Sequence, residues 1–201
     1  KAHIEFSPIP LDDNTLVYGS LVSEGVEFYD LEELDSTALP KRKFYLAKKE
    51  NGKWRSSGEF NDPIGAEQQQ IGNGAISPDG NRFYFTRCEE NFQGKVICRL
   101  FYSEKEGNKW GEPIEMNDLI NLSGYTTTQP TVGRESKRNQ EVIYFVSDRP
   151  EGKGGLDIWF TEYHARTKRF RAPQNAGAAI NTPGTEFTPY YDVTTHSLYF
   201  S

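Results

Sequence analysis

Residues 110–124, WGEPIEMNDLINLSG, and residues 170–184, FRAPQNAGAAINTPG, align without a gap. Both stretches begin with an aromatic residue, place a proline three positions later and end on the same Ile-Asn-x-x-Gly motif. A looser third copy begins at Trp54. Recurrence of a motif at an interval of this size indicates a chain built from repeated structural units.

Each copy of the motif leads into a short step in which a polar residue precedes a proline. Periods of roughly 40–60 residues composed of short strands are typical of the blades of a β-propeller. The sequence therefore predicts an all-β fold. The steps are Ser7-Pro8, Ser77-Pro78, Gln129-Pro130 and Thr188-Pro189, and their prolines lie 70, 52 and 59 residues apart.

A triplet of apolar, strand-forming residues follows each step, as expected of a strand buried between stacked blades. We expect four-stranded antiparallel blades with an inner strand before the proline step and a turn after it, clearest at Ser77-Pro78-Asp79-Gly80. The triplets are Leu16-Val17-Tyr18, Phe83-Tyr84-Phe85, Ile143-Tyr144-Phe145 and Leu198-Tyr199-Phe200.

The units divide the chain into a single β-propeller region, residues 1–201, with about three complete blades and the start of a fourth. The blade boundaries fall at 1–70, 71–125, 126–183 and 184–201. An open arc of blades would leave a bare edge strand. We therefore expect the chain to be part of a larger propeller, or its ring to be completed by another polypeptide.

The composition narrows the classes of partner. A net charge of -6 argues against a nucleic-acid partner, which would favour a basic surface. No apolar run approaches the ~20 residues needed to span a bilayer, so we expect no membrane span. The sequence begins at Lys1 and shows no signal peptide, which we interpret as a mature or trimmed chain.

The two cysteines, Cys88 and Cys98, lie ten residues apart on two strands that we expect to pair. A cross-strand disulfide is reasonable if their Cα atoms fall within about 7 Å. The alternative is a pair of buried free thiols. An oxidising compartment would favour the disulfide.

The units differ in length mainly between their second and third strands, so the longer loops should crowd one face of the fold. Insertions on one face of a repeat protein commonly mark the binding face. The longest insertion, residues 21–41, is acidic and also carries apolar residues. It is either a solvated loop or a partner-docking segment, whose predicted contact residues are Phe28, Tyr29, Leu31, Glu32 and Glu33.

Most of the other conspicuous residues are expected to serve the repeat itself. Asp157 could bind a metal together with Asp148, but capping of a loop through backbone N–H groups is the favoured interpretation. A side chain that recurs in successive units, such as Asn121 and Asn181, suggests a repeated structural hydrogen bond. The residues assigned structural roles are Pro78, Asp79, Gly80, Trp110, Asn121, Asp157 and Asn181.

The sequence lacks the motifs of the common catalytic sites. The three histidines have no metal-ligand spacing, and no Gly-x-Ser-x-Gly or phosphate-binding glycine loop occurs. We therefore expect neither enzymatic activity nor a cofactor. The alternative is a carbohydrate-active propeller, either a glycan-binding module or a glycoside hydrolase that uses Glu5 and Glu186 as its carboxylate pair.

Two stretches of the sequence resemble the WD40-like, Pro-Asp-motif propeller repeats of the TolB type. They are ISPDGxxFYF at residues 76–85 and SDRPxGxGGxDIW at residues 147–159. The Pro-x6-Ile-Asn-x-x-Gly stretch is closer still to the propellers of Bacteroidota OmpA-family envelope lipoproteins, which include components of the type IX secretion and gliding machinery. The complete Ser-Pro-Asp-Gly turn occurs only in the second unit.

This resemblance implies a non-enzymatic, protein-binding scaffold of the bacterial cell envelope. Its location would be periplasmic or outer-membrane associated, and its partners would be other envelope proteins. Members of that group also bind peptidoglycan through a separate OmpA-like domain. No such domain lies within these residues, so that activity is not carried over.

Overall fold

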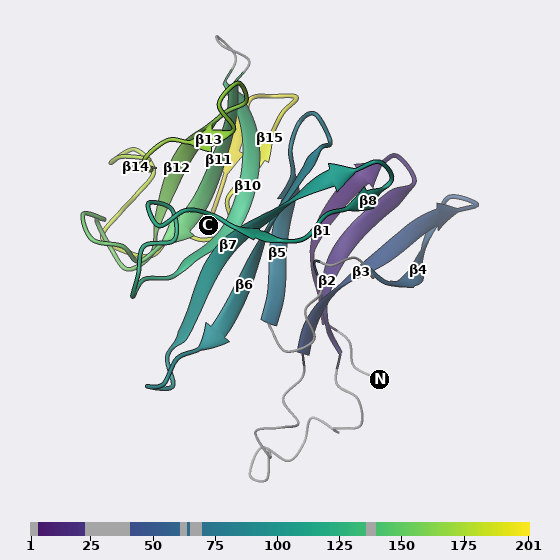
Figure 1. Cartoon of the computed structure of the whole chain (residues 1–201), viewed down its shortest axis with the longest axis horizontal. Helices are drawn as coiled ribbons and strands as arrows, with labels where there is room; N and C mark the ends of the chain where they lie inside the picture. The colour runs from purple at the N-terminus through teal and green to yellow at the C-terminus, as the bar shows by residue number, and fades with distance from the viewer. Residues whose placement is uncertain (1–3, 23–40, 61–63, 65–69, 136–139) are drawn as a thin grey trace.

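The alternating apolar stretches of the sequence form antiparallel strands (Figure 1). The computed structural model describes residues 4–22, 41–60, 64, 70–135 and 140–201. Within these ranges every regular element is a strand and no helix occurs. The prediction of an all-β fold is therefore confirmed for this part of the chain.

The strands form four antiparallel sheets that follow one another in chain order. Sheet 1 contains β1 (Ile4–Asp12), β2 (Thr15–Val22), β3 (Lys41–Glu50) and β4 (Lys53–Glu59). Sheet 2 contains β5 (Gln70–Ile76), β6 (Arg82–Glu90), β7 (Val96–Glu106), β8 (Lys109–Trp110) and β9 (Ile114–Glu115). Sheet 3 contains β10 (Thr127–Glu135), β11 (Gln140–Ser147), β12 (Asp157–His164), β13 (Arg169–Phe170) and β14 (Gln174–Asn175). Sheet 4 contains β15 (Tyr190–Asp192) and β16 (Ser197–Tyr199).

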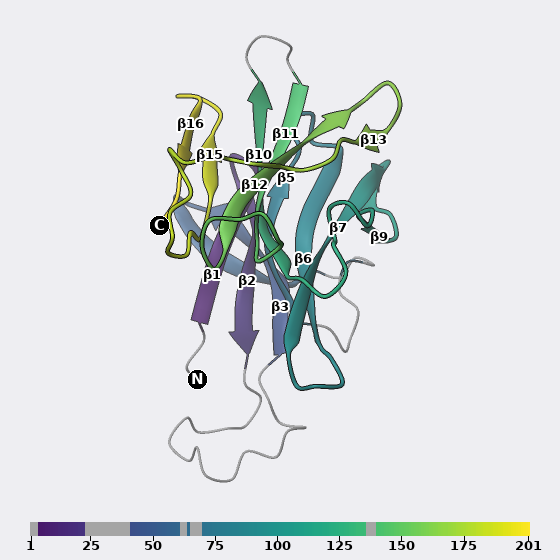
Figure 2. The same cartoon turned by 90° about the vertical axis from the view of Figure 1, so that its left-hand side faces the viewer.

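The first strands of successive sheets are neighbours in space, since β1 contacts β5, β5 contacts β10 and β10 contacts β15. The later strands of sheets 1 to 3 spread away from this line, as Figure 1 shows. The β6–β7 hairpin extends below sheet 3 in both views (Figures 1 and 2). The described connections from sheet 2 to sheet 3 and from sheet 3 to sheet 4 lie at the same end as that hairpin.

The first strand of every sheet is interrupted by the same β-bulge. Opposite one residue of the neighbouring strand, the first strand carries one extra residue, and the pairing continues beyond it. The extra residue has a positive φ in all four sheets, which is uncommon for a residue other than glycine. These residues are Ser7 (49°), Asn73 (45°), Gln129 (53°) and Thr188 (49°).

The positions of the bulges show that the four proline steps of the sequence are not all structurally equivalent. The residue after the bulge is proline in sheets 1, 3 and 4 but Gly74 in sheet 2. A Cβ atom at Gly74 would lie 2.8 Å from the carbonyl oxygen of Tyr84, so a larger residue is excluded there. Pro78 instead follows β5 in a turn that is closed by a 2.8 Å hydrogen bond from Gly80 N to Ser77 O. Pro78 is therefore not the counterpart of Pro8, Pro130 and Pro189.

Two apolar clusters fill the spaces between the first three sheets. The first junction, between sheets 1 and 2, packs the ring of Phe83 against Phe44, Phe60 and Trp110 with centroid distances of 5.4–5.9 Å. The second junction, between sheets 2 and 3, packs Phe170 against Tyr84, Tyr102 and Tyr163. Burial of this aromatic surface is the main term that holds the sheets together.

The repeat aromatic is the second residue of the fourth strand in each of the first three sheets, at Trp54, Trp110 and Phe170. In sheets 2 and 3 a proline three residues later divides that strand in two, because proline cannot donate to the ladder. Sheet 1 has Ser57 at this position, and its strand β4 is continuous with a bulge. Trp54 is also the one of the three that is largely exposed.

Candidate functional site

The connections at one end of the molecule are hydrogen-bonded into a single surface that we call the loop end. It comprises residues 91–95, 116–126, 148–156 and 176–187, together with Val96 at the start of β7. Thr126 N donates to Asp148 Oδ1 at 2.6 Å, and Gly155 N donates to Gly184 O at 2.8 Å. The loop lengths predicted this crowding. The longest insertion of that prediction, residues 21–41, lies largely outside the described residues.

The two repeat asparagines clamp the links between sheets. Asn121 accepts a hydrogen bond from Leu100 N and donates to the carbonyl oxygens of Leu100 and Met116, at 2.9, 2.9 and 3.1 Å. Asn181 does the same to both backbone groups of Ile158, at 2.8 and 2.9 Å. Both side chains are buried. Each amide therefore fixes a link to the third strand of the sheet that the link leaves.

Asp157 caps the loop that precedes β12. Its carboxylate accepts hydrogen bonds from Lys153 N at 2.6 Å, Gly154 N at 3.1 Å and Asn175 Nδ2 at 2.8 Å. Glycine is required beside it, since a Cβ atom on Gly154 would lie 2.0 Å from the carbonyl oxygen of Gly184. Asp148 is engaged elsewhere, by Thr126 N and by Lys95 Nζ at 3.5 Å. The two carboxylates are thus used separately by the fold.

Sequence reasoning missed the most buried cation of this end, Arg149. Its guanidinium donates to the carbonyl oxygens of Leu119 and Ile120, and it stacks over the rings of Phe145 and Trp159 at 5.0 and 5.2 Å. Burial lowers the pKa of Arg149 to about 10, although the charge of Asp148 opposes this shift. Arg149 therefore remains a cation at neutral pH and ties the second link to sheet 3.

Arg87 plays the same role for the first link. It donates to Ile64 O at 2.8 Å and lies over the rings of Phe85 and Phe101, the counterparts of the two rings that contact Arg149. Burial lowers the pKa of Arg87. The register of β6 and β11 places the two arginines two positions apart. A comparison of the repeats residue by residue therefore does not pair them.

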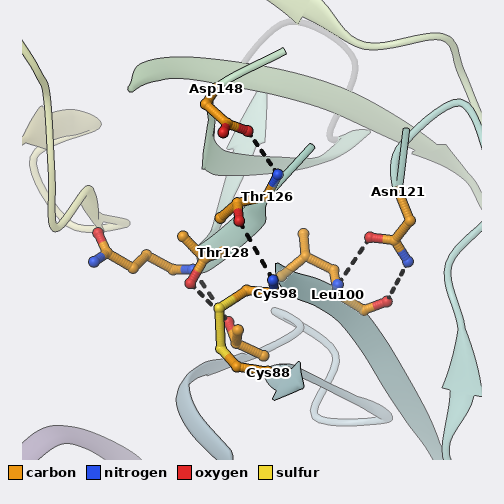
Figure 3. The surroundings of a disulfide bond; sticks show 9 residues. Cys88, Cys98, Leu100, Asn121, Thr126, Thr128 and Asp148 are labelled. Carbon is orange, nitrogen blue, oxygen red and sulfur yellow. Dashed lines mark hydrogen bonds between the residues drawn. A yellow bond between two sulfur atoms is a disulfide. The ribbon is translucent and has the colours of Figure 1, made fainter. Parts of the chain in front are cut away.

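A disulfide joins Cys88 and Cys98, which are direct partners in the β6–β7 ladder with Cα atoms 4.0 Å apart. Figure 3 shows that it lies beside the link to sheet 3, where Thr126 and Thr128 face the hairpin. Cys98 N donates to Thr126 Oγ1 at 3.4 Å, and Thr126 N in turn donates to Asp148. The hairpin is thus covalently closed next to the loop end.

Several large apolar side chains of the loop end are exposed to solvent. They come from the β6–β7 hairpin, from the link between sheets 2 and 3 and from the link to sheet 4. Exposed apolar side chains that gather on one surface commonly mark a protein-binding site. They are Phe92, Val96, Leu119, Leu122 and Phe187.

A second concave feature lies where the first strands meet. It is a groove of about 680 Å³, and all four bulges line it. Trp54, Tyr190 and the prolines after the bulges supply its apolar wall. The bulges of sheets 3 and 4 are joined directly, since Thr188 N donates to Gln129 Oε1 at 2.7 Å. Gln129 N in turn donates to Thr86 Oγ1 of strand β6 at 3.1 Å.

Neither carboxylate of the glycosidase alternative lines this groove. Glu186 is buried and accepts hydrogen bonds from Thr182 N at 3.1 Å and Thr182 Oγ1 at 2.6 Å. Glu5 is exposed and pairs with Ser20 in the β1–β2 ladder. The structure thus gives Glu186 a structural contact and brings no pair of candidate carboxylates into the groove.

The predicted contact residues Phe28, Tyr29, Leu31, Glu32 and Glu33 lie outside the described residues. Within the described ranges, no group of three or more His, Cys, Asp or Glu side chains is placed to hold a metal ion. The same ranges contain no helix that is long and apolar enough to cross a membrane. No protein-family model matches the chain, and no curated protein matches it either.

Proposed function

We propose that the four sheets are successive blades of a β-propeller of the Pro-Asp-motif, TolB-like type, three of them complete. Three observations support this: the strand order is the same in the first three sheets, each first strand carries the same bulge, and the first strands are consecutive neighbours. On the sequence resemblance, its relatives are the propellers of Bacteroidota OmpA-family envelope lipoproteins.

The proposed function is a non-enzymatic, protein-binding scaffold of the bacterial cell envelope, attached to an outer-membrane assembly such as the type IX secretion or gliding machinery. The observation that carries it is the exposed apolar set on the loop end, Phe92, Val96, Leu119, Leu122 and Phe187. The loops that bear several of these side chains are fixed by Asn121, Arg149 and Thr126. A rigid surface loses little conformational entropy on binding.

The Cys88–Cys98 disulfide supports an extracytoplasmic location, because such bonds persist in the periplasm and are rare in the reducing cytosol. Thiol labelling of the protein after acid quenching of intact cells tests this proposal. We expect both cysteines to resist labelling until a reductant is added. Labelling of both without a reductant would place the chain in a reducing compartment.

Affinity purification from native envelope membranes, followed by mass spectrometry, tests the scaffold. We expect envelope proteins to co-purify in stoichiometric amounts and to be lost from a Phe92→Ser, Leu119→Ser, Leu122→Ser variant. The matched control is Val193→Ser, which also removes an exposed apolar side chain but lies in the β15–β16 turn. A second variant, Phe28→Ser with Tyr29→Ser, tests the acidic insertion.

The location of the loss separates the two proposed binding surfaces. Loss of partners from the Phe92 variant alone assigns binding to the loop end, and loss from the Phe28 variant alone assigns it to the insertion. Equal retention by all variants, or loss from Val193→Ser as well, would contradict a specific docking surface. Retained circular dichroism and thermal unfolding show that each variant is folded.

A further inference from the structure

A small pocket of about 320 Å³ opens at the end of the second junction opposite the loop end. Its walls come from the β5–β6 turn and the start of β6 on one side, and from the ends of β10, β11 and β12 on the other. Residues 136–139, which lie between Arg134 and Gln140 in the sequence, are outside the described residues, so the lining is given for the described residues alone. Its volume is at the lower end of the range of about 300–1,000 Å³ that is usual for small-molecule sites.

The floor of the pocket is a buried arginine that is already neutralised. Arg82 Nη2 donates to Glu141 Oε2 at 2.6 Å and to Asp79 Oδ2 at 3.1 Å, and its guanidinium lies over the ring of Tyr163 at 4.3 Å. Tyr84 donates to the second oxygen of Glu141 at 2.5 Å. Burial alone would lower the pKa of Arg82, but the hydrogen bond and charge of Glu141 raise it overall.

One edge of this guanidinium remains open. Among the described residues, Arg82 Nη1 has no acceptor, and it is not sealed from solvent. Each of the other two nitrogens already has acceptors. An oxygen atom that enters the pocket would therefore meet one charged N–H donor, Nη1, on a guanidinium that its neighbours hold in place.

The walls add further positive charge. Arg134 and Arg166 line the pocket together with His164, and neither arginine forms an ion pair with any other described residue. Both acidic side chains of the lining, Asp79 and Glu141, are already bonded to Arg82. Gln140 also lines it, and its Nε2 atom is buried without an acceptor in the described part of the chain.

The lining thus carries three arginines against two carboxylates in a chain whose net charge is -6. Like charges that face one shared space repel one another unless a counter-ion lies between them. We propose that this pocket binds a small oxyanion, such as phosphate, sulfate or a short dicarboxylate. Arg82 provides a fixed donor from below, and Arg134 and Arg166 close on the anion from the walls. The site is independent of the loop end.

Titration of the ¹⁵N-labelled chain with inorganic phosphate, against sodium chloride at equal ionic strength, tests the proposal. We expect saturable shifts at Arg82 Nε and at the backbone amides of Gly80, Asn81 and Arg166. Arg134→Gln and Arg166→Gln should each weaken binding about ten-fold, since each removes a charge-assisted hydrogen bond. Sulfate and malonate, titrated in the same way, distinguish a tetrahedral from a planar anion.

Arg55→Gln is the matched control, because it removes an exposed arginine from strand β4 in sheet 1. It should leave phosphate affinity within two-fold of that of the parent chain. Saturation by any one of the three anions, with this pattern of variants, supports the site. Shifts that follow ionic strength alone, or an equal loss in Arg55→Gln, would overturn it. Arg55 and Arg166 are exposed and Arg134 is half-buried, and thermal unfolding verifies that each variant folds.

Discussion

The first and second junctions are both built from aromatic rings, but they differ in what accompanies the rings. The first junction places Phe83 among Phe44, Phe60 and Trp110. The second buries an ion pair, Arg82 with Glu141, above its aromatic cluster. The junctions between consecutive sheets can therefore be filled by apolar packing alone or by apolar packing together with a buried ion pair.

The links that follow sheets 1 and 2 differ in the same way. Ile120 is followed by Asn121, whose amide clamps the link to β7, whereas Ile64 is followed in the sequence by Gly65. Pro113 divides the fourth strand of sheet 2, whereas Ser57 lies in a continuous β4. The comparison teaches that the repeat tolerates loss of its proline and its asparagine together, provided that the buried isoleucine is kept.

Replacing Arg82 with Met should have the largest effect and would remove the polar character of the second junction. It leaves Glu141 buried without its cation, and breaking a buried pair in this way costs about 3–5 kcal/mol. Urea unfolding monitored by circular dichroism measures the loss. The free energy of unfolding should fall enough to make the variant marginal at 37 °C.

The double variant Arg82→Met, Glu141→Leu makes the second junction resemble the first. Because both charges are then absent, we expect it to recover at least half of the stability lost in the single variant. A double variant as unstable as Arg82→Met would show that the remaining loss comes from packing on Tyr163 or from the buried Tyr84 hydroxyl, which loses its acceptor Glu141. Adding Tyr84→Phe to the double variant separates these two causes.

Asn121→Ala should lower the free energy of unfolding by about 2–3 kcal/mol, because it leaves buried backbone groups of Leu100 and Met116 without partners. The control is Asn117→Ala, which removes an exposed turn bond to Leu119 N and should cost about 1 kcal/mol. Hydrogen exchange at the Leu100 amide locates the effect. Slow exchange of that amide in Asn121→Ala would contradict the clamp.

Pro113→Ser gives the fourth strand of sheet 2 the residue type that sheet 1 has at the equivalent position, Ser57. We expect the free energy of unfolding to fall by about 0.5–1 kcal/mol, chiefly because the unfolded chain gains freedom, and Tm to fall by about 1–4 °C. Calorimetry measures it. A loss above that of Asn121→Ala would mean that the proline, and not the asparagine, fixes the link.

The repeated local features of this fold were readable from the sequence. The strand triplets occupy the second strands β2, β6 and β11, and the turn at Ser77-Pro78-Asp79-Gly80 is formed as expected. The asparagine clamp and the cap at Asp157 follow from the known tendency of these side chains to bond to nearby backbone. Each depends on a few neighbouring residues, which is what a motif records.

The sequence did not reveal the contacts that join one sheet to the next. Arg82 and Glu141 lie 59 positions apart and meet only after two sheets stack. Arg87 and Arg149 perform one task from positions that do not align. Gly74 replaces proline because the carbonyl oxygen of Tyr84 is close, a distance that no spacing of prolines predicts.

Asp79→Asn should have the smallest effect on stability. It tests the ion pair between the exposed Asp79 and Arg82. Burial would raise the pKa of Asp79, but hydrogen bonds from Ser77 and Asn81 and the charge of Arg82 lower it overall. Because the folded-state pKa lies below the unfolded value of about 3.9, its stabilisation is complete above that value. The stabilisation is then lost as the pH falls through the folded pKa.

Since the Asp79 side chain is 44% exposed, we expect Asp79→Asn to cost less than about 1 kcal/mol at pH 7. Urea unfolding of both proteins between pH 7 and pH 3 should show the difference shrinking below about pH 4. Asp12→Asn, in the corresponding turn of sheet 1, removes the charge of a carboxylate that accepts from Asn14 N and has no arginine in contact among the described residues. If the two variants lost stability equally and retained that loss in acid, the carboxylate of Asp79 would act only as a turn acceptor. The electrostatic difference between the two junctions would then consist of the Arg82–Glu141 ion pair, with no contribution from the charge of Asp79.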